Sequence, residues 1–461
     1  MSPQDAPGLT AGDSSPATGR GEFSSRFGFL MAASGSAVGL GNIWGFPTNA
    51  ASNGGAAFLF AYLVMAFALA YPALMAELII GRHAKANSIK ALQSISRGPK
   101  TRLLAVFVGS LGILTVSFIL SFYAIVSGWM MAFFLDPLAR LTGMSGAASW
   151  LVTDGELRNG IFVVLFMALT IHIIRAGVKD GIERWASRLM PMLILILLLL
   201  IVYVLAQPGA MDGLRAYLVP DFTRIANPRL LVDAMGQAFF SLSLGVGTML
   251  IYGSYISKRE NLPVTGSLVA LLDIGIAVIA GMLILPAMYV ALASGVEIFN
   301  PDGSLVAGPA LIVSVLPELF GDMGAMGVFV SLAFFLLMTI ASLTSSISML
   351  EVPVAFAVEY RKMARGRAAL LIGAVVTCVS LVIVLNFDPL FDLVVNYATE
   401  VSQPLLGFFF CIFVAWIWRR DAVLKEIVQG SPEAESGVFW KIWPVYVKFV
   451  CPAAILLVYL G

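Results

Sequence analysis

The amino-acid sequence predicts an all-α membrane protein with about eleven transmembrane helices, and three observations support this fold class. Of the 461 residues, 59% are hydrophobic and 12% are charged, and the mean hydropathy is +0.92; soluble domains carry about 25% charged residues. Apolar stretches long enough to cross about 30 Å of hydrocarbon recur along the whole chain. Basic residues gather in alternate loops, as expected for a polytopic protein.

Each expected crossing begins where an apolar stretch follows a polar segment. The starting points are Phe27, Ala56, Leu103, Gly160, Leu189, Leu231, Leu262, Gly327, Ala368, Leu390 and Ile442. Lysine and arginine follow the second, fourth, sixth, eighth and tenth crossings, whereas the intervening loops are mainly acidic. Because basic loops stay in the cytoplasm, the N-terminus is expected there. Residues 1–22, rich in Ser, Gly and Pro and without a signal-peptide pattern, are expected to form a flexible cytoplasmic tail.

Charge and cysteine usage exclude other classes. The net charge is +1 and the basic residues are spread over many loops, so no nucleic-acid partner is expected. Cys378, Cys411 and Cys451 all lie in apolar segments, which predicts neither a disulfide framework nor a metal cluster. No N-x-Ser/Thr glycosylation sequence occurs, and we therefore expect a bacterial inner membrane. The sequence makes no prediction of the oligomeric state.

Two crossings contain sequences that interrupt a helix. Residues 35–47 read GSAVGLGNIWGFP in the first crossing, and residues 240–248 read FSLSLGVGT in the sixth. Glycines also serve close helix packing, but two similar breaks five crossings apart indicate an inverted repeat, since an odd number of crossings turns the second unit upside down. The expected units are residues 23–207 and 208–420, followed by a cytoplasmic loop and a last crossing in residues 421–461.

An unwound segment at membrane depth needs partners for its backbone, because unpaired N–H and C=O groups cost several kcal/mol each in lipid. Free N–H groups at the N-terminus of a half-helix suit a carboxylate, and free carbonyls suit a small hard cation. The two breaks therefore predict one shared site for an anionic group and a cation near the middle of the membrane.

These motifs, with NGG at 53–55 and LTSS at 343–346, resemble the neurotransmitter:sodium symporter family over about residues 20–420. The resemblance implies a LeuT-like 5+5 inverted repeat in which helices 1 and 6 are unwound at mid-membrane. It also implies two sodium ions. The first would be bound by the substrate carboxylate and by Ala37, Asn42, Ser241 and Asp273; the second would be bound by Gly35, Val38, Ala341, Thr344 and Ser345. LTSS alone is equally typical of hydroxyl groups that bond to their own helix.

Gly39 bears on the substrate that the resemblance implies. Family members that carry amines have an aspartate at this position, which supplies a carboxylate to the first sodium site, whereas a glycine leaves that carboxylate to an amino-acid substrate. The implied substrate-binding residues are Ala37, Leu40, Gly41, Ile119, Tyr123, Phe240, Ser241, Ser243, Val246, Ser345 and Met349. Tyr123 taken alone also fits a packing or interfacial role. The apolar walls favour a neutral substrate with a branched or aromatic side chain.

Three acidic residues lie within apolar segments. Asp273 is by default functional, because its burial is costly. It would balance the sodium charge without an anion, so chloride-independent transport is expected; a snorkelling or helix-capping aspartate is the alternative. Glu77 is expected to accept hydrogen bonds from N–H groups of the broken helices. Glu400 has no family counterpart and suggests only a water-filled vestibule or a proton path.

The resemblance implies an inner gate, in which Arg20 pairs with Glu359 and in which Phe23 and Tyr255 lie nearby. Arg20 alone also fits a charge that only sets topology.

The outer gate departs from the family pattern, because Gly45 replaces the usual arginine while Asp392 remains at the partner position. Either another cation pairs with Asp392, or the aromatic rings of Tyr123 and Phe240 close this gate.

Together these features predict a symporter in which the sodium gradient drives uptake of neutral, hydrophobic or aromatic amino acids by alternating access. A sodium-dependent amino-acid sensor or channel without coupled turnover is the alternative. An enzyme is not expected, because there is no HExxH motif or serine–histidine arrangement, and His83 and His172 lie near the ends of crossings. The expected partners are the amino acid, two sodium ions and lipid, with no organic cofactor.

Overall fold

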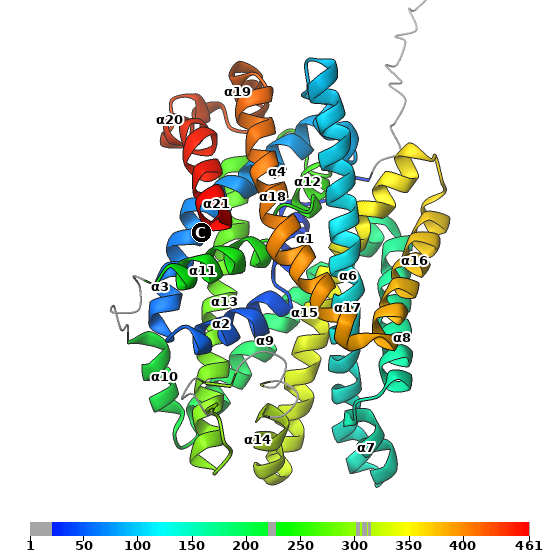
Figure 1. Cartoon of the computed structure of the whole chain (residues 1–461), viewed down its shortest axis with the longest axis vertical. Helices are drawn as coiled ribbons and strands as arrows, with labels where there is room; N and C mark the ends of the chain where they lie inside the picture. Colours follow the sequence, from blue (N-terminus) through cyan, green and yellow to red (C-terminus); the bar gives the residue numbers. More distant parts are fainter. Residues whose placement is uncertain (1–20, 220–226, 301–304, 307–310, 312–314, 461) are drawn as a thin grey trace, which may run out of the picture.

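The computed structural model describes residues 21–219, 227–300, 305–306, 311 and 315–460. Long helices run along one axis, and short helices lie at both ends of the bundle (Figure 1). Within these residues, nine helical segments are long and apolar enough to cross a membrane. They are Ala56–Ala84 (α3 and α4), Pro99–Leu141 (α6), Glu156–Arg175 (α8), Val178–Leu205 (a π-helical turn and α9, Arg184–Leu205), Leu262–Ala293 (α13), Gly324–Tyr360 (α15), Arg365–Leu385 (α16), Phe387–Ile417 (α17 and α18) and Val438–Leu457 (α20 and α21).

Shorter helices complete the bundle and divide some of these segments. They are α1 (Arg26–Ala37), α2 (Phe46–Ser52), α3 (Ala56–Met65), α4 (Tyr71–Ala84), α5 (Ser88–Ser94), α7 (Ser145–Val152), α10 (Ala210–Leu218), α11 (Pro228–Ser241), α12 (Thr248–Gly253), α14 (Leu316–Asp322), α17 (Phe387–Val395), α18 (Gln403–Ile412), α19 (Arg420–Val428), α20 (Val438–Val445) and α21 (Cys451–Leu460). We refer to the two ends of the bundle as the α19 end, at the top of Figure 1, and the α10 end, at the bottom.

The two crossings expected to be broken do not run as single helices. α1 and the helical segment Gly41–Ser52 form a bent pair with an angle of 52° and make a tenth crossing when taken together. The expected sixth crossing is divided into α11, of 14 residues, and α12, of 6 residues. Each half is shorter than the roughly 20 residues that span a bilayer. Neither half is among the segments long and apolar enough to cross a membrane, so the described residues give up to ten crossings where the sequence predicts about eleven.

The surface of the long helices is apolar, as lipid contact requires. On α9, Leu195, Leu199 and Val202 are exposed, although they are large hydrophobic residues at helical spacing. The opposite face, which includes Leu193 and Leu197, is buried against the bundle. A helix that is hydrophobic all round is typical of a membrane span.

The first break begins at the end of α1. The backbone of Val38 is extended, with ψ 96°, which ends the helical series. The next N–H groups leave the i−4 pattern, and the Leu40 N–H donates instead to the Tyr123 hydroxyl at 3.0 Å. Helical structure resumes with a π-helical turn at Gly41–Gly45. Pro47 lies in the first turn of α2, where its missing N–H costs no hydrogen bond.

The second break depends on backbone conformations that favour glycine. Ser243, Gly245 and Gly247 have φ values of 52°, 83° and 81°. A Cβ atom on Gly245 would also lie 2.3 Å from the Gln403 carbonyl oxygen, so this position excludes a side chain for two reasons.

Glu77 of α4 binds the backbone of the second break. Its carboxylate accepts hydrogen bonds from the Gly245 N–H at 2.7 Å and from the Leu250 N–H at 3.3 Å. The expected role is therefore seen, and both donors belong to the second broken helix. The unwound segment has its polar partners built into the fold.

The α19 end is closed over the first break by the segment that precedes α1. The Phe23 N–H donates to the Tyr255 carbonyl at 3.2 Å, and the Phe23 ring packs edge-on against Phe29, Tyr252 and Tyr255. At the start of α1, the Glu183 carboxylate accepts hydrogen bonds from the Ser24 N–H and hydroxyl. These contacts join the start of α1 to the turn that precedes α9 and to α12 and the residues that follow it.

A buried ion pair supports this closed end. Glu351 of α15 is fully buried, and its carboxylate accepts hydrogen bonds from the Tyr255 hydroxyl at 2.5 Å and from two Arg365 nitrogens at 3.0 and 2.5 Å. Arg365 also donates to the Ile174 carbonyl at 2.9 Å. The pair thus links α8, α15 and α16 to Tyr255, which contacts Phe23.

Replacing Arg365 by glutamine will loosen the α19 end, because it leaves the buried Glu351 carboxylate without its cation. We expect amide hydrogen exchange in residues 22–30 to accelerate about tenfold, a moderate effect because Arg365 itself is partly exposed. Arg419→Gln is the matched control, since the Arg419–Asp421 pair is exposed on both sides. Equal exchange in the two variants would show that the Glu351 pair does not hold this end closed.

A second ionic cluster fastens α19 to the bundle. The Glu426 carboxylate accepts hydrogen bonds from Arg82 Nε at 2.8 Å and Lys258 Nζ at 2.7 Å, and His83 Nδ1 lies 3.2 Å away. Burial opposes the charge of Glu426, but these hydrogen bonds and the Arg82 charge outweigh burial and lower its pKa from 4.5 to about 2.

The stabilisation from Glu426 will depend on pH in one direction. Its pKa is lower in the folded than in the unfolded protein, so the contribution is complete above about pH 4.5 and is lost as the pH falls towards 2. We expect the difference in unfolding temperature between wild type and Glu426→Gln to be constant from pH 7 to pH 5 and smaller at pH 3. A difference that does not change with pH would contradict this assignment.

Candidate functional site

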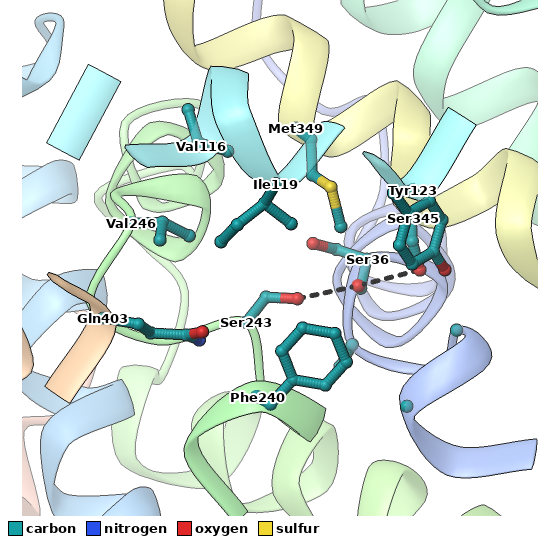
Figure 2. Close-up of a pocket in the computed structure, with 13 residues that line it drawn as sticks. Ser36, Val116, Ile119, Tyr123, Phe240, Ser243, Val246, Ser345, Met349 and Gln403 are labelled. Carbon is teal, nitrogen blue, oxygen red and sulfur yellow. Dashed lines mark hydrogen bonds between the residues drawn. The ribbon is translucent and has the colours of Figure 1, made fainter. Parts of the chain in front are cut away.

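A narrow pocket lies between the two breaks. Figure 2 shows side chains from α1, α6, α15, α18 and the second break converging on it. The lining residues are Ser36, Ala37, Gly39, Gly41, Val116, Ile119, Tyr123, Phe240, Ser243, Val246, Ser345, Met349 and Gln403. None of these side chains carries a formal charge.

One end of the pocket is polar. The Ser243 hydroxyl donates to the Ser36 carbonyl at 2.9 Å, and the Ser345 hydroxyl donates to the same carbonyl at 3.2 Å (Figure 2). The Tyr123 hydroxyl lies beside them and accepts the hydrogen bond from the Leu40 N–H. This end therefore offers hydroxyl groups, a carbonyl and amide groups of the first break, which together suit an ammonium and a carboxylate group.

The other walls of the pocket are apolar. Val116, Ile119 and Tyr123 lie on one face of α6, because they are three and four residues apart. Val246 and Met349 complete the wall from the second break and from α15. The spacing from Ile119 would have revealed Val116, which the sequence analysis missed.

A buried carboxylate lies next to the first break. Asp273 of α13 is fully buried, and it accepts hydrogen bonds from Asn42 Nδ2 at 2.7 Å and from the Ser241 hydroxyl at 2.8 Å. The Asn42 Oδ1 in turn accepts a hydrogen bond from the Gly39 N–H at 3.3 Å. The structure thus brings together the three side chains of the first expected sodium site, and their oxygen donors suit a hard cation.

The second expected sodium site lies where α1 packs against α15. The Ser345 hydroxyl is 3.3 Å from the Gly35 carbonyl oxygen. A Cβ atom on Gly35 would lie 3.1 Å from Thr344 Cβ, so the two helices approach closely here. Val38 and Ala341 are fully buried in these neighbouring segments. The Thr344 hydroxyl donates within its own helix, to the carbonyls of Ile340 and Ala341.

All the predicted substrate residues except two line the pocket. The Ser241 hydroxyl faces Asp273 instead. Leu40 lines a second and larger cavity, while its N–H contacts Tyr123. Residues that sequence reasoning missed are Ser36, Val116 and Gln403. Gln403 was detectable as a polar residue within an apolar crossing, whereas the role of the Ser36 carbonyl depends on where the helix breaks.

The larger cavity has a volume of about 910 Å³, and Tyr123 and Phe240 line both this cavity and the pocket. We call it the vestibule. It is lined by Trp44 and Asn49, by the start of α11 at Asn227–Arg229, and by residues of α6 and α17. Since α11 runs from this cavity to the second break, the vestibule lies on the α10 side of the pocket, opposite the closed α19 end.

At Gly45, where the family pattern has an arginine, a neutral side chain lies in the vestibule wall. Gln237 is next to Gly45: a Cβ atom on Gly45 would lie 3.2 Å from Gln237 Oε1. Gln237 donates to the Gly41 carbonyl at 2.6 Å and accepts from Asn49 at 3.0 Å. Among the described residues no cation pairs with Asp392, which is exposed. Gly41, Tyr123 and Phe240 line both the pocket and the vestibule.

The expected inner-gate pair is only partly visible. Arg20 lies outside the described residues, as does the side chain of Glu400. The Glu359 carboxylate accepts hydrogen bonds from the N–H and the side-chain amide of Asn87, both at 2.9 Å. Tyr255 bonds to Glu351, a residue that the sequence analysis did not include.

Comparison with known proteins places this chain in a family. The model of the sodium:neurotransmitter symporter family matches residues 20–154 and 144–460. An uncharacterized sodium-dependent transporter, YhdH, of Bacillus subtilis is 31% identical over 95% of this chain and 97% of its own. Another uncharacterized sodium-dependent transporter, of Haemophilus influenzae, is 30% identical over 96% of this chain and 98% of its own.

A solved structure confirms the expected fold. The crystal structure of MhsT in complex with L-phenylalanine matches with a TM-score of 0.83 and 35% identity, over 96% of this chain and 99% of that chain. The fold is thus the LeuT-like fold, and the relatives are multi-pass membrane transporters rather than enzymes. The chain belongs to the sodium:neurotransmitter symporter family and is a sodium-dependent transporter.

Proposed function

We propose that this transporter is a symporter that uses the sodium gradient to take up neutral amino acids with hydrophobic or aromatic side chains. The observation that carries the proposal is the connection between the pocket and the buried carboxylate. Gly39 lines the pocket, its N–H bonds to Asn42, and Asn42 bonds to Asp273. A ligand that binds beside Gly39 is therefore connected through Asn42 to the buried carboxylate of the expected cation site.

In this proposal the first break binds the amino-acid backbone. The substrate carboxylate binds at the Leu40 and Gly41 N–H groups and the Tyr123 hydroxyl, which already contacts the Leu40 N–H. The ammonium group binds at the Ser243 hydroxyl and at the carbonyls of Ala37, Phe240 and Ser241. Half-helix ends provide these groups without any charged side chain.

Two sodium ions occupy the donor sets described above. The first is bound by Asp273, Asn42, Ser241, the Ala37 carbonyl and the substrate carboxylate. The second is bound by the Gly35, Val38 and Ala341 carbonyls and the Thr344 and Ser345 hydroxyls. Because substrate and the first ion complete each other's coordination, each raises the affinity for the other, which is the basis of coupling. The fixed charge of Asp273 makes chloride unnecessary.

The side-chain class follows from the walls of the pocket. No lining side chain is charged, and Val116, Ile119, Val246 and Met349 are apolar. A charged substrate side chain would lose its hydration without gaining a partner. The binding of L-phenylalanine by MhsT, which has the same fold, supports an amino acid of this class.

Transport by alternating access follows from the closure at two levels. The contacts of Phe23, Glu351 and Arg365 hold the α19 end, while Tyr123 and Phe240 lie at the boundary of the pocket and the vestibule. We place the α19 end in the cytoplasm of a bacterial cell, on the side of the basic loops, with the N-terminal tail (1–22). The two repeats are residues 23–207 and 208–420, and residues 421–461 follow.

Thermal unfolding of the purified protein tests the proposal, because a ligand that binds the folded state raises the unfolding temperature. Neutral aromatic amino acids should stabilise the protein in sodium but not in potassium, whereas amines and taurine should not. Stabilisation that is equal in potassium would contradict the shared site. In proteoliposomes, accumulation of the amino acid against its gradient requires coupled turnover, so binding without accumulation would indicate the sensor or channel instead.

A further inference from the structure

Gln403 occupies the end of the pocket opposite Tyr123 and Ser345 (Figure 2). It is the first residue of α18, and it is 2% exposed. Its side-chain Nε2 donates to the Leu244 carbonyl at 2.9 Å and to the Phe239 carbonyl at 3.3 Å. Two acceptors on one side of the amide determine its orientation, because an oxygen in that place would face two other oxygens.

The other amide atom has no such partner. Gln403 Oε1 is buried, and no hydrogen-bond donor among the described residues reaches it. Figure 2 shows the amide of Gln403 directed into the pocket, towards Ser243. Since buried acceptors are nearly always hydrogen-bonded, this oxygen is suited to a donor carried by a ligand.

One wall of the pocket between Gln403 and the polar end is apolar. It is formed by Val116, Ile119, Val246 and Met349, while Ser243 and the Phe240 ring lie on the other side (Figure 2). A ligand that fills the pocket therefore needs an amino-acid backbone at one end, an apolar body, and a hydrogen-bond donor at its tip. Lysine and arginine have donors, but their charge would have no counter-charge among the lining residues.

We propose that Gln403 Oε1 accepts a hydrogen bond from the side chain of the substrate, so that indole and phenol side chains are preferred over an unsubstituted aromatic ring. The inference rests on the proposed amino-acid site and identifies the substrate class within it. Gln403 is then a specificity-determining residue: the Nε2 group holds the second break, and the Oε1 group recognises the ligand.

The test compares ligands that differ in a single donor. L-tryptophan and L-3-(3-benzothienyl)alanine have nearly the same shape, but sulfur replaces the indole N–H in the second. We expect tryptophan to bind wild type about tenfold more tightly in sodium, the value of one satisfied buried hydrogen bond. Tyrosine should exceed phenylalanine in the same direction.

A variant separates recognition from structure. In Gln403→Met the acceptor is lost, and we expect the ratio of the two dissociation constants to fall to about one. A purely structural role would weaken both ligands equally and leave the ratio unchanged, which would overturn the proposal. Gln237→Met is the matched control, since this glutamine contacts Gly41 and Asn49 at the vestibule, and the tenfold ratio should persist there.

The outcomes also distinguish this inference from the proposed function. If both ligands bind wild type in sodium with equal affinity, the role of Gln403 Oε1 is refuted while the amino-acid site stands. If neither ligand binds in sodium, the proposed function itself fails. The wild-type comparison decides the question even if Gln403→Met does not fold, because it needs no variant.

Discussion

Replacing Asp273 by asparagine will abolish most sodium-driven uptake at low chloride. The substitution retains the size of the side chain but removes a negative charge that is fully buried beside the first break. A unit charge about 4 Å away contributes roughly 4 kcal/mol at an effective dielectric constant of 20, so we expect sodium affinity to fall by about a hundredfold to a thousandfold. Uptake of a radiolabelled amino acid against sodium concentration measures this change.

The hydrogen bonds of Asp273 add to the effect. In the variant, an amide NH₂ group faces either Asn42 Nδ2 or the Ser241 hydroxyl, where the carboxylate accepted hydrogen bonds at 2.7 and 2.8 Å. The exposed Asp388 provides the matched control, and Asp388→Asn should transport normally. Wild-type uptake that requires chloride would refute the assigned role of Asp273, because its carboxylate would then not suffice to balance the sodium charge.

The second large effect is expected at Gly39. Gly39→Asp will weaken amino-acid binding by about a hundredfold or more, because the new carboxylate would compete with that of the substrate for the first sodium ion. Space adds to this effect: a Cβ atom at Gly39 would lie 2.4 Å from the Ser345 hydroxyl and 2.6 Å from the Tyr123 hydroxyl. Isothermal titration with tryptophan in sodium measures the loss.

Gly39→Ala separates charge from space, since it adds the same Cβ atom without a carboxylate. We expect alanine to weaken both tryptophan and tryptamine, whereas aspartate should weaken tryptophan and improve tryptamine relative to alanine. Unchanged affinity of Gly39→Asp for tryptophan would refute the carboxylate argument.

The breaks in the helices could be predicted from sequence because their cause is local. Gly245 and Gly247 adopt positive φ values that other residues rarely reach, and the sequence shows both glycines directly. The position of Val116 in the pocket could also be predicted, because it lies three residues before Ile119 on the same face of α6. Family motifs likewise indicated Asp273 and Asn42, which the structure brings within 2.7 Å.

The residues that could not be predicted depend on contacts between distant segments. Arg365 looks like one basic residue among several after the eighth crossing, and only the folded chain directs it back to Glu351. The alternatives at the outer gate were likewise undecided by sequence, because Gln237 is 192 positions after Gly45 and its contact there is tertiary. The family motif predicts an arginine–aspartate pair, and it does not indicate that a neutral glutamine, Gln237, lies beside Gly45 instead.

The bonds from Glu77 to Gly245 and Leu250 have a consequence for how such transporters diverge. They come from a helix that contributes no side chain to the pocket, so the distorted backbone is preorganised by the scaffold and does not rely on cargo to form. Mutations in the pocket wall on α6 and α15 that leave Glu77 in place can then alter selectivity without removing the bonds that hold the second break. Within one architecture, the wall of the pocket and the backbone of the break can therefore change separately.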